Sequence, residues 1–140
     1  MEKLVKPAII VVDMLNDFVY GALTCDRGKA IVPATARLLE AAREKGVPVI
    51  FSNDAHLRNI DRELAIWGDH AIAGTPGAEV IPELKLSEGD YVVPKRRYSG
   101  FFQTDLDILS EDPREGLGIH AAGEGVGCEG MTQVVESNGR

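Results

Sequence analysis

Two histidines and an aspartate lie in one polar stretch of the sequence and could bind a divalent metal. Asp54 and His56 form an Asp-x-His pair, and an extended backbone would place both side chains on the same side. His70 lies in the same stretch, residues 52–77, and would supply a third ligand. Three protein ligands that leave open positions are typical of a catalytic metal site. The alternative is two surface histidines beside carboxylates such as Asp69.

Asp13 and Lys95 each follow a short apolar run. Asp13 comes directly after residues 8–12, and Lys95 comes just after residues 91–93. α/β proteins place their ligands at the carboxyl ends of parallel strands, so both positions favour chemistry. A lysine there can lower the pKa of a nucleophile or hold developing negative charge. The alternatives are an aspartate that caps a turn and a solvated lysine that, like the Arg96-Arg97 pair after it, is only a surface charge.

The two cysteines of the chain are Cys25 and Cys128. Cys128, in the stretch Gly-Val-Gly-Cys-Glu-Gly, is a candidate nucleophile. At an unperturbed pKa of about 8.5 only about 3% of a thiol is ionised at neutral pH, so a catalytic cysteine needs a lysine, a histidine or a helix N-terminus beside it. Two cysteines cannot form a disulfide framework, and we expect reduced thiols in a cytosolic protein.

Apolar runs that alternate with helical patterns predict the elements that position these residues. Residues 8–12 and 47–51 are continuous apolar runs, typical of parallel strands buried on both faces. An amphipathic helix is predicted between them, from Pro33 to Lys45, and Gly46 would end it. These elements form a βαβ unit and predict a three-layer α/β fold. The sequence further predicts a short helix over 61–67, a strand over 91–93 that ends at Pro94, and a helix over 101–109.

The alternation of strands and helices stops after Leu109. Residues 110–140 hold 7 of the 15 glycines of the chain but only five Val, Ile or Leu residues, and Pro113 interrupts the preceding helix. No apolar run there is long enough to predict a buried strand. We therefore expect a sheet of three strands and one domain over residues 1–140, in which 110–140 is an atypical glycine-rich tail.

The composition excludes several classes of function. A chain of 140 residues with 44% hydrophobic and 26% charged residues is typical of a globular domain rather than of a disordered chain. The net charge of -7 would repel phosphate backbones and anionic lipids, so we expect no nucleic acid and no membrane as partner. The longest apolar run is too short to cross a bilayer, and the first residues lack the pattern of a secretory signal. We expect a cytoplasmic protein.

Four stretches of the sequence occur in order, at compatible spacing, over about residues 8–109. They are IIVVDMLNDF at 9–18, NDAH at 53–56, WGDHAIAGTPGAEVIPEL at 67–84 and VPKRRYSGFFQTDLD at 93–107. Together they resemble the isochorismatase-like cysteine hydrolases, and most closely the nicotinamidase-type amidohydrolases. The resemblance implies a Rossmann-like α/β/α fold with a mostly parallel sheet, which in this chain would be incomplete at the C-terminus.

The resemblance also implies a catalytic triad. Asp13 and Lys95 take the places of its aspartate and lysine, and Cys128 falls close to the count expected for its nucleophile. In such enzymes the aspartate accepts the thiol proton and the lysine stabilises the thiolate. The thiolate attacks a small amide, ammonia leaves, and water hydrolyses the thioester. Backbone N–H groups hold the oxyanion.

A metal and a pocket follow from the same resemblance. Asp54, His56 and His70 match positions that bind a divalent metal, usually zinc, which holds the pyridine nitrogen of the substrate. Phe18 and Trp67 fall where aromatic walls of the substrate pocket are expected. Because all three metal ligands are present, a nicotinamide-like amide is favoured over isochorismate. The resemblance further implies a small-molecule amide as partner and a homo-oligomer.

The tail departs from the family pattern. Family members carry a hydrophobic strand and then a turn of the form Gly-Val-x-Thr-x-x-Cys-Val, and neither is matched before Cys128. Three hypotheses stay open: a cysteine amidohydrolase, an inactive family member that is truncated or altered by a shift of reading frame, and a metal-dependent hydrolase without a cysteine nucleophile. A Cys128→Ala variant and removal of the metal would distinguish them.

Overall fold

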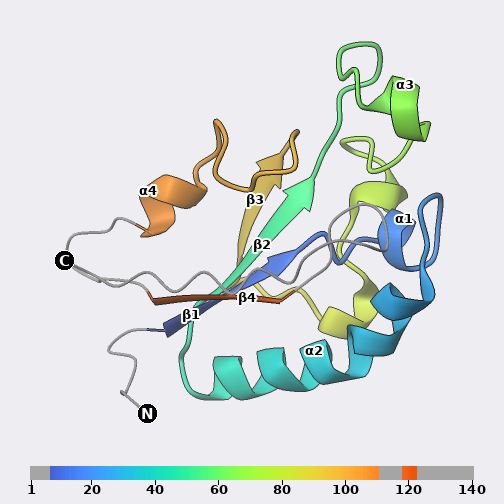
Figure 1. Ribbon diagram of the computed structural model, residues 1–140. Helices are drawn as coiled ribbons and strands as arrows, with labels where there is room; N and C mark the ends of the chain where they lie inside the picture. Colours follow the sequence, from blue (N-terminus) through green and yellow to red (C-terminus); the bar gives the residue numbers. More distant parts are fainter. Residues whose placement is uncertain (1–6, 111–117, 123–140) are drawn as a thin grey trace.

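The computed structural model describes residues 7–110 and 118–122 and shows a parallel sheet with helices on both faces (Figure 1). The strands are β1 (Pro7–Val12), β2 (Val49–Asp54), β3 (Tyr91–Lys95) and β4 (Gly118–Ala122), in the order β3-β2-β1-β4. The helices are α1 (Asn16–Val19), α2 (Asp26–Glu44), α3 (Leu64–Trp67) and α4 (Leu106–Ser110), with short 3₁₀ turns η1 (Pro76–Ala78) and η2 (Pro82–Leu84). The predicted α/β fold with a mostly parallel sheet is confirmed.

The two central strands have apolar side chains on both faces of the sheet. The strand predicted over 47–51 is β2, which begins and ends later; all six of its residues are buried, including the polar Ser52, Asn53 and Asp54 beyond the apolar run. On one face, Val11 of β1 and Leu39 of α2 belong to the same buried cluster. On the other face, Ile50 of β2 packs with Leu106 of α4. The sheet is therefore the middle layer of three, with α2 and α4 on opposite sides (Figure 1).

The helix between the first two strands begins earlier than predicted. It starts at Asp26 rather than at Pro33, which lies exposed inside it. The N-cap is Cys25, whose Sγ accepts a hydrogen bond from the backbone N–H of Gly28 at 3.4 Å. The predicted end is confirmed, because Gly46 adopts the left-handed conformation (φ +68°) that commonly ends a helix.

The strand predicted over 91–93 does not end at Pro94. β3 continues to Lys95, with Asn53 paired to Pro94 and Asp54 paired to Lys95. Among the described residues β3 is an edge strand, where a proline is tolerated. This register places Lys95 directly beside the last residue of β2.

The prediction of a three-stranded sheet is wrong. β4 pairs in parallel with β1, from Pro7 opposite Gly118 to Val11 opposite Ala122. The sequence of β4 is Gly-Ile-His-Ala-Ala, which lacks the apolar run used to predict buried strands. β4 runs parallel to β1, so both strands have their carboxyl ends on the same side of the sheet. In the sequence β4 ends six residues before Cys128. Cys128 and Pro113 both lie outside the described residues.

The two shorter predicted helices are present with later starts. The helix predicted over 61–67 spans Leu64–Trp67, and the one predicted over 101–109 spans Leu106–Ser110. In the part of the chain that the structure describes, no helix has the length and apolar character needed to cross a membrane.

Candidate active site

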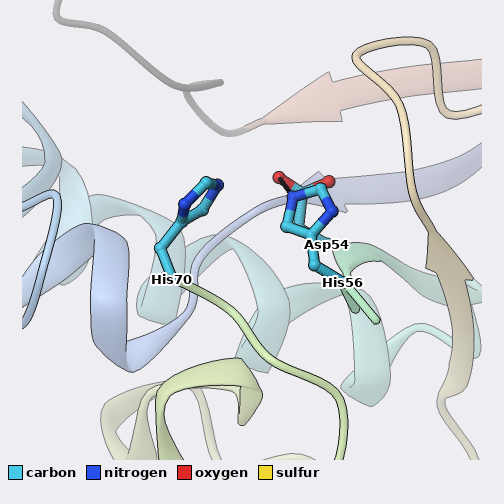
Figure 2. A group of neighbouring side chains, drawn as sticks. All are labelled: Asp54, His56 and His70. Carbon is cyan, nitrogen blue, oxygen red and sulfur yellow. Dashed lines mark ion pairs between the residues drawn. The ribbon is translucent and has the colours of Figure 1, made fainter. Parts of the chain in front are cut away.

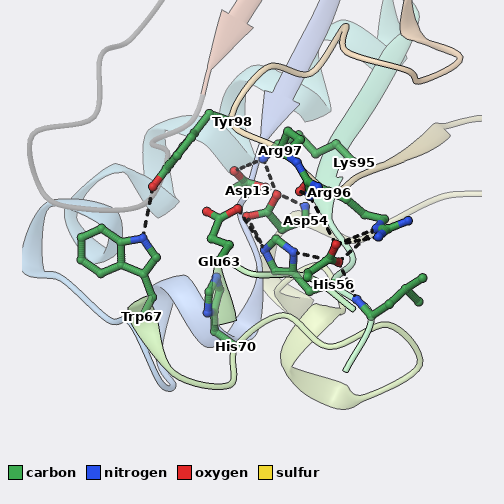
Figure 3. Close-up of polar contacts among 12 residues, drawn as sticks. Asp13, Asp54, His56, Glu63, Trp67, His70, Lys95, Arg96, Arg97 and Tyr98 are labelled. Atoms are coloured by element: carbon green, nitrogen blue, oxygen red, sulfur yellow. Dashed lines mark hydrogen bonds and ion pairs between the residues drawn. The ribbon is translucent and has the colours of Figure 1, made fainter. Parts of the chain in front are cut away.

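Three charged side chains meet where β1, β2 and β3 end. Lys95 Nζ lies 2.8 Å from Asp13 Oδ2 and 2.5 Å from Asp54 Oδ1. Asp13 Oδ1 also accepts a hydrogen bond from the backbone N–H of Asp54 at 2.8 Å. Each of the three residues is only 2% exposed. The predicted proximity of Asp13 and Lys95 is therefore present in the fold, and Asp54, which was expected only as a metal ligand, joins them (Figure 3).

Burial and charge act against each other in this cluster. Burial, and then the charge of Asp54, raise the pKa of Asp13 above its ordinary value even though Lys95 opposes the shift. Burial alone would lower the pKa of Lys95, but the two carboxylates outweigh it and raise that pKa. Burial would raise the pKa of Asp54, but the nearby imidazole of His56 and the charge of Lys95 lower it. Asp13 is thus the member of the cluster best suited to take up a proton.

Asp54 has a second set of neighbours on its other side, the two histidines. One ligand atom from each of Asp54, His56 and His70 lies within 4.8 Å of the others, and all three residues are buried. Figure 2 shows the two imidazole rings and the carboxylate around one common space. His56 Nε2 is 3.5 Å from Asp54 Oδ2, and the two imidazole centroids are 4.8 Å apart. The three residues that the sequence singled out as candidate ligands therefore come together.

His70 is 14 positions beyond His56 in the sequence, and backbone hydrogen bonds bring the two together. The N–H of His56 donates to the Ala71 carbonyl at 2.8 Å, and the N–H of Ala73 donates to the His56 carbonyl at 2.9 Å. The N–H of Ala71 itself donates to Asp17 Oδ2 at 2.8 Å. Ala71 is fully buried with φ +43°, a left-handed conformation that is uncommon for a residue with a side chain. These contacts fix the loop that carries His70.

The hydrogen-bond partners of the imidazole nitrogens show whether this cluster fits a metal. His70 Nδ1 lies 2.8 Å from the Gly68 carbonyl, whereas His70 Nε2 has no hydrogen-bond partner. The ring nitrogens of His56 make only long contacts to carboxylates, Nε2 to Asp54 at 3.5 Å and Nδ1 to Asp61 at 3.4 Å, and neither contact has hydrogen-bond geometry. Buried polar atoms are almost always satisfied, so the unpaired Nε2 atoms of His56 and His70 near Asp54 indicate a site for a further group. Two imidazoles and a carboxylate fit zinc and similar divalent ions.

The two aromatic candidates lie at different depths. Phe18 is buried, and its ring centroid is 5.7 Å from that of His70. Trp67 is 43% exposed, and its Nε1–H donates to the Tyr98 hydroxyl at 3.1 Å (Figure 3). The structure thus places Phe18 against the metal-ligand candidates and Trp67 at the more exposed side.

Two acidic residues near the histidines were missed by the sequence reading. Asp61 is buried, with Oδ2 3.4 Å from His56 Nδ1, and Glu63 Oε2 is 4.0 Å from His56 Nε2. Arg96 and Arg97, read as surface charges, are part exposed but both form ion pairs with Asp61. The only signal was that acidic residues stand five and seven positions after a candidate ligand.

A cavity of about 250 Å³ opens beside Lys95. Its other lining residues are Pro94, Arg96, Arg97, Phe102, Gln103 and Thr104. The cavity is slightly smaller than the range of about 300–1,000 Å³ typical of small-molecule sites.

Residues 7–117 match the isochorismatase domain, and the chain therefore belongs to the isochorismatase-like hydrolase family. It is 39% identical over 111 residues to a probable inactive nicotinamidase of Arabidopsis thaliana, covering 71% of this chain and 56% of that protein. The chain spans about half the length of the curated relatives it matches.

Solved structures agree with this assignment. N-carbamoylsarcosine amidase from Thermoplasma acidophilum is 39% identical with a TM-score of 0.77, covering 84% of this chain and 67% of that one. The pyrazinamidase of Pyrococcus horikoshii in complex with zinc is 32% identical with a TM-score of 0.75, covering 86% of this chain and 71% of that one.

Proposed function

We propose that this chain is a cysteine amidohydrolase that converts a small nicotinamide-like amide to its acid and ammonia. The observation that carries the proposal is the position of Lys95 Nζ between the buried carboxylates of Asp13 and Asp54. This arrangement provides a proton acceptor and a cation within one cluster. The similarity to a zinc-bound pyrazinamidase supports an amide of this kind as the substrate.

Cys128 is the proposed nucleophile. β4 supports this proposal because it ends at the sheet edge that carries Asp13, six residues before Cys128 in the sequence. Asp13 accepts the thiol proton while the Lys95 ammonium stabilises the thiolate. The sulfur then forms a bond to the amide carbonyl carbon, and the carbonyl electron pair moves to oxygen. Backbone N–H groups hold this oxyanion.

The remaining steps release ammonia with the proton taken from the thiol and then restore the thiol with a proton from water. The carbonyl re-forms, the C–N bond breaks, and the leaving nitrogen takes the proton from Asp13 to depart as ammonia. Water then attacks the thioester while Asp13 takes one of its protons. The C–S bond breaks, and that proton returns to the sulfur of Cys128, so that the acid is released and the enzyme is restored.

Asp54, His56 and His70 would hold zinc or another divalent metal. When bound, the metal supplies a Lewis-acid site for the ring nitrogen of the substrate and so orients the amide. Asp54 would then serve both halves of the site, because its Oδ1 contacts Lys95 and its Oδ2 faces His56. Phe18 and Trp67 would contact the ring of the substrate as aromatic walls.

Ammonia release from nicotinamide tests the proposal. The chain purified with zinc should release ammonia, Cys128→Ala should abolish the release, and the matched variant Cys25→Ala should retain it. If Cys128→Ala stays active but a chelator stops turnover, the chain is a metal-dependent hydrolase without a cysteine nucleophile.

An inactive family member is the second candidate, favoured by the likeness to a probable inactive nicotinamidase. If this candidate is right, the folded chain should bind zinc and nicotinamide, as measured by calorimetry, but release no ammonia. Sequencing the gene would test whether the frame continues without interruption through residues 110–140.

A further inference from the structure

The carboxylate of Asp61 is fixed from several sides. Its side chain has no exposed surface. The backbone N–H of Leu57 donates to Oδ2 at 2.7 Å, and Arg96 donates through Nε at 3.0 Å to both oxygens and through Nη2 at 2.6 Å to Oδ1. Arg97 Nη1 adds a longer contact of 3.3 Å to Oδ1. These donors hold the carboxylate in one orientation.

The imidazole ring of His56 lies between two carboxylates. Nδ1 is 3.4 Å from Asp61 Oδ2, and Nε2 is 3.5 Å from Asp54 Oδ2 (Figure 3). A neutral imidazole carries its proton on one nitrogen and can bind a metal only through the other. Glu63 Oε2 is also 4.0 Å from Nε2, so both nitrogens have a carboxylate nearby. A metal bound by Asp54 and His56 would take the Nε2 lone pair, and the ring proton then belongs on Nδ1, where Asp61 can accept it.

We propose that Asp61 is a positioning residue for the metal centre: it fixes the ring orientation of His56 and the tautomer in which Nε2 binds the metal. The inference rests on the metal-binding part of the proposed function. A carboxylate hydrogen-bonded to the outer nitrogen of a histidine ligand raises the basicity of that ligand and strengthens metal binding.

His70 shows the same arrangement with a different acceptor. Its Nδ1 is 2.8 Å from the Gly68 carbonyl, and its Nε2 is left without a partner. Both histidines therefore have an oxygen beside Nδ1. The acceptor of His70 is a backbone atom that no substitution removes, whereas the acceptor of His56 is a side chain that can be changed.

Arg96 allows Asp61 to remain charged while buried. A buried carboxylate without a partner is strongly disfavoured, and the hydrogen bonds and positive charge of Arg96 offset that cost. Arg96 directly follows Lys95 at the end of β3. The end of one strand thus supplies the cation of the Asp13 cluster and, one residue later, the cation that supports His56.

The test is the zinc affinity of the full chain, measured by competition with a chromophoric chelator. Asp61→Asn keeps the shape of the side chain and an acceptor for Leu57, but removes the charge beside His56. The matched control is Asp90→Asn. Asp90 also binds an arginine, Arg43 at 2.6 Å, and accepts a backbone N–H, but it contacts no histidine. We expect Asp61→Asn to weaken zinc binding about 10- to 100-fold, and Asp90→Asn to change it less than about threefold.

Equal affinities of the two variants would overturn the role of Asp61 while leaving zinc binding intact. A wild-type chain that binds no zinc would overturn the metal centre and this inference with it. Neither result depends on turnover, so the cysteine mechanism is judged separately by ammonia release.

A second measurement needs no variant and covers the case in which Asp61→Asn fails to fold. In the zinc-loaded wild-type chain labelled with ¹⁵N, we expect His56 to carry its proton on Nδ1 and to bind zinc through Nε2. A proton on Nε2, with zinc on Nδ1, would overturn the proposal.

Discussion

The functional residues are positioned by different means in two regions, the ends of the strands and the long connection between β2 and β3. Asp13, Asp54 and Lys95 follow from the register of parallel strands, because each stands at or just after a strand end. His70 and Asp61 lie in the long connection between β2 and β3, where isolated bridges and side-chain hydrogen bonds replace a ladder. The first region is set by the sheet and the second by individual contacts.

Because of this difference, the two halves of the site should respond differently to substitutions. The Asp13–Lys95 cluster depends on balanced charge in a buried place, so a loss of charge there affects the whole fold. The histidine cluster depends on loop contacts, so a single altered contact affects metal binding more than folding. Substitutions in the two regions should therefore have different effects on stability and on metal binding.

Replacing Lys95 with Met should have the largest effect. The substitution leaves the carboxylates of Asp13 and Asp54 buried without their shared cation, and breaking a buried ion pair costs about 3–5 kcal/mol. Urea unfolding measures the loss of stability. The exposed Lys29→Met should stay within about 0.5 kcal/mol of wild type. Similar stability of the two variants would contradict the assignment of Lys95 as the central cation.

Replacing His70 with Ala should affect metal binding before it affects folding. We expect zinc affinity to fall by at least about 100-fold, because a ligand is lost rather than the partner of a ligand. Competition with a chromophoric chelator measures it. Asp69→Asn is the neighbouring control, since Asp69 is exposed and pairs with Arg58. An unchanged affinity in His70→Ala would remove His70 from the metal centre.

Gly77→Ala should loosen the loop that carries His70, although Gly77 itself is not a candidate ligand. A Cβ at Gly77 would clash with Asp17 Oδ2, so this carboxylate must move. The movement weakens the hydrogen bond that it accepts from the backbone N–H of Ala71. We expect a loss of about 1–3 kcal/mol in unfolding free energy together with weaker zinc binding.

The control for this prediction is Gly89→Ala. A Cβ at Gly89 meets no atom within 4 Å, and we expect a change of less than about 0.5 kcal/mol. The same loss of zinc affinity in both glycine variants would show that Asp17 does not position the loop.

Tyr98→Phe should have the smallest effect. It removes the hydroxyl that accepts the hydrogen bond from Trp67, but both side chains are exposed and water can replace the contact. We expect stability within about 0.5 kcal/mol of wild type by thermal unfolding. A loss above about 2 kcal/mol would mean that the exposed aromatic pair supports the fold.

The sequence predicted the residues that strand register positions. Asp13, Asp54 and Lys95 could be placed at one edge because apolar runs mark strands and parallel strands align their carboxyl ends. His56 and His70 were paired from composition and spacing alone. The backbone contacts through Ala71 that bring His70 to this edge leave no periodic signal.

The errors have local physical causes. β4 was missed because backbone pairing with β1 forms a strand from the sequence Gly-Ile-His-Ala-Ala, which carries no apolar run. The early start of α2 was missed because Pro33 was taken for a helix start, although the cap is Cys25 and the proline lies inside the helix. Asp61 was missed because its importance depends on Arg96, 35 positions later in the chain.

The reactivity of the Cys128 thiol reports on its surroundings in the folded chain. We propose that this thiol shares one site with Asp13 and Lys95, and an ordinary thiol is only about 3% ionised at pH 7. Mass spectrometry can follow the iodoacetamide alkylation of Cys128 in the folded chain and in the same chain unfolded in urea. If the thiol lies beside Lys95 and Asp13, we expect roughly tenfold faster alkylation of Cys128 in the folded chain at pH 7. Equal or slower alkylation in the folded chain would contradict this arrangement.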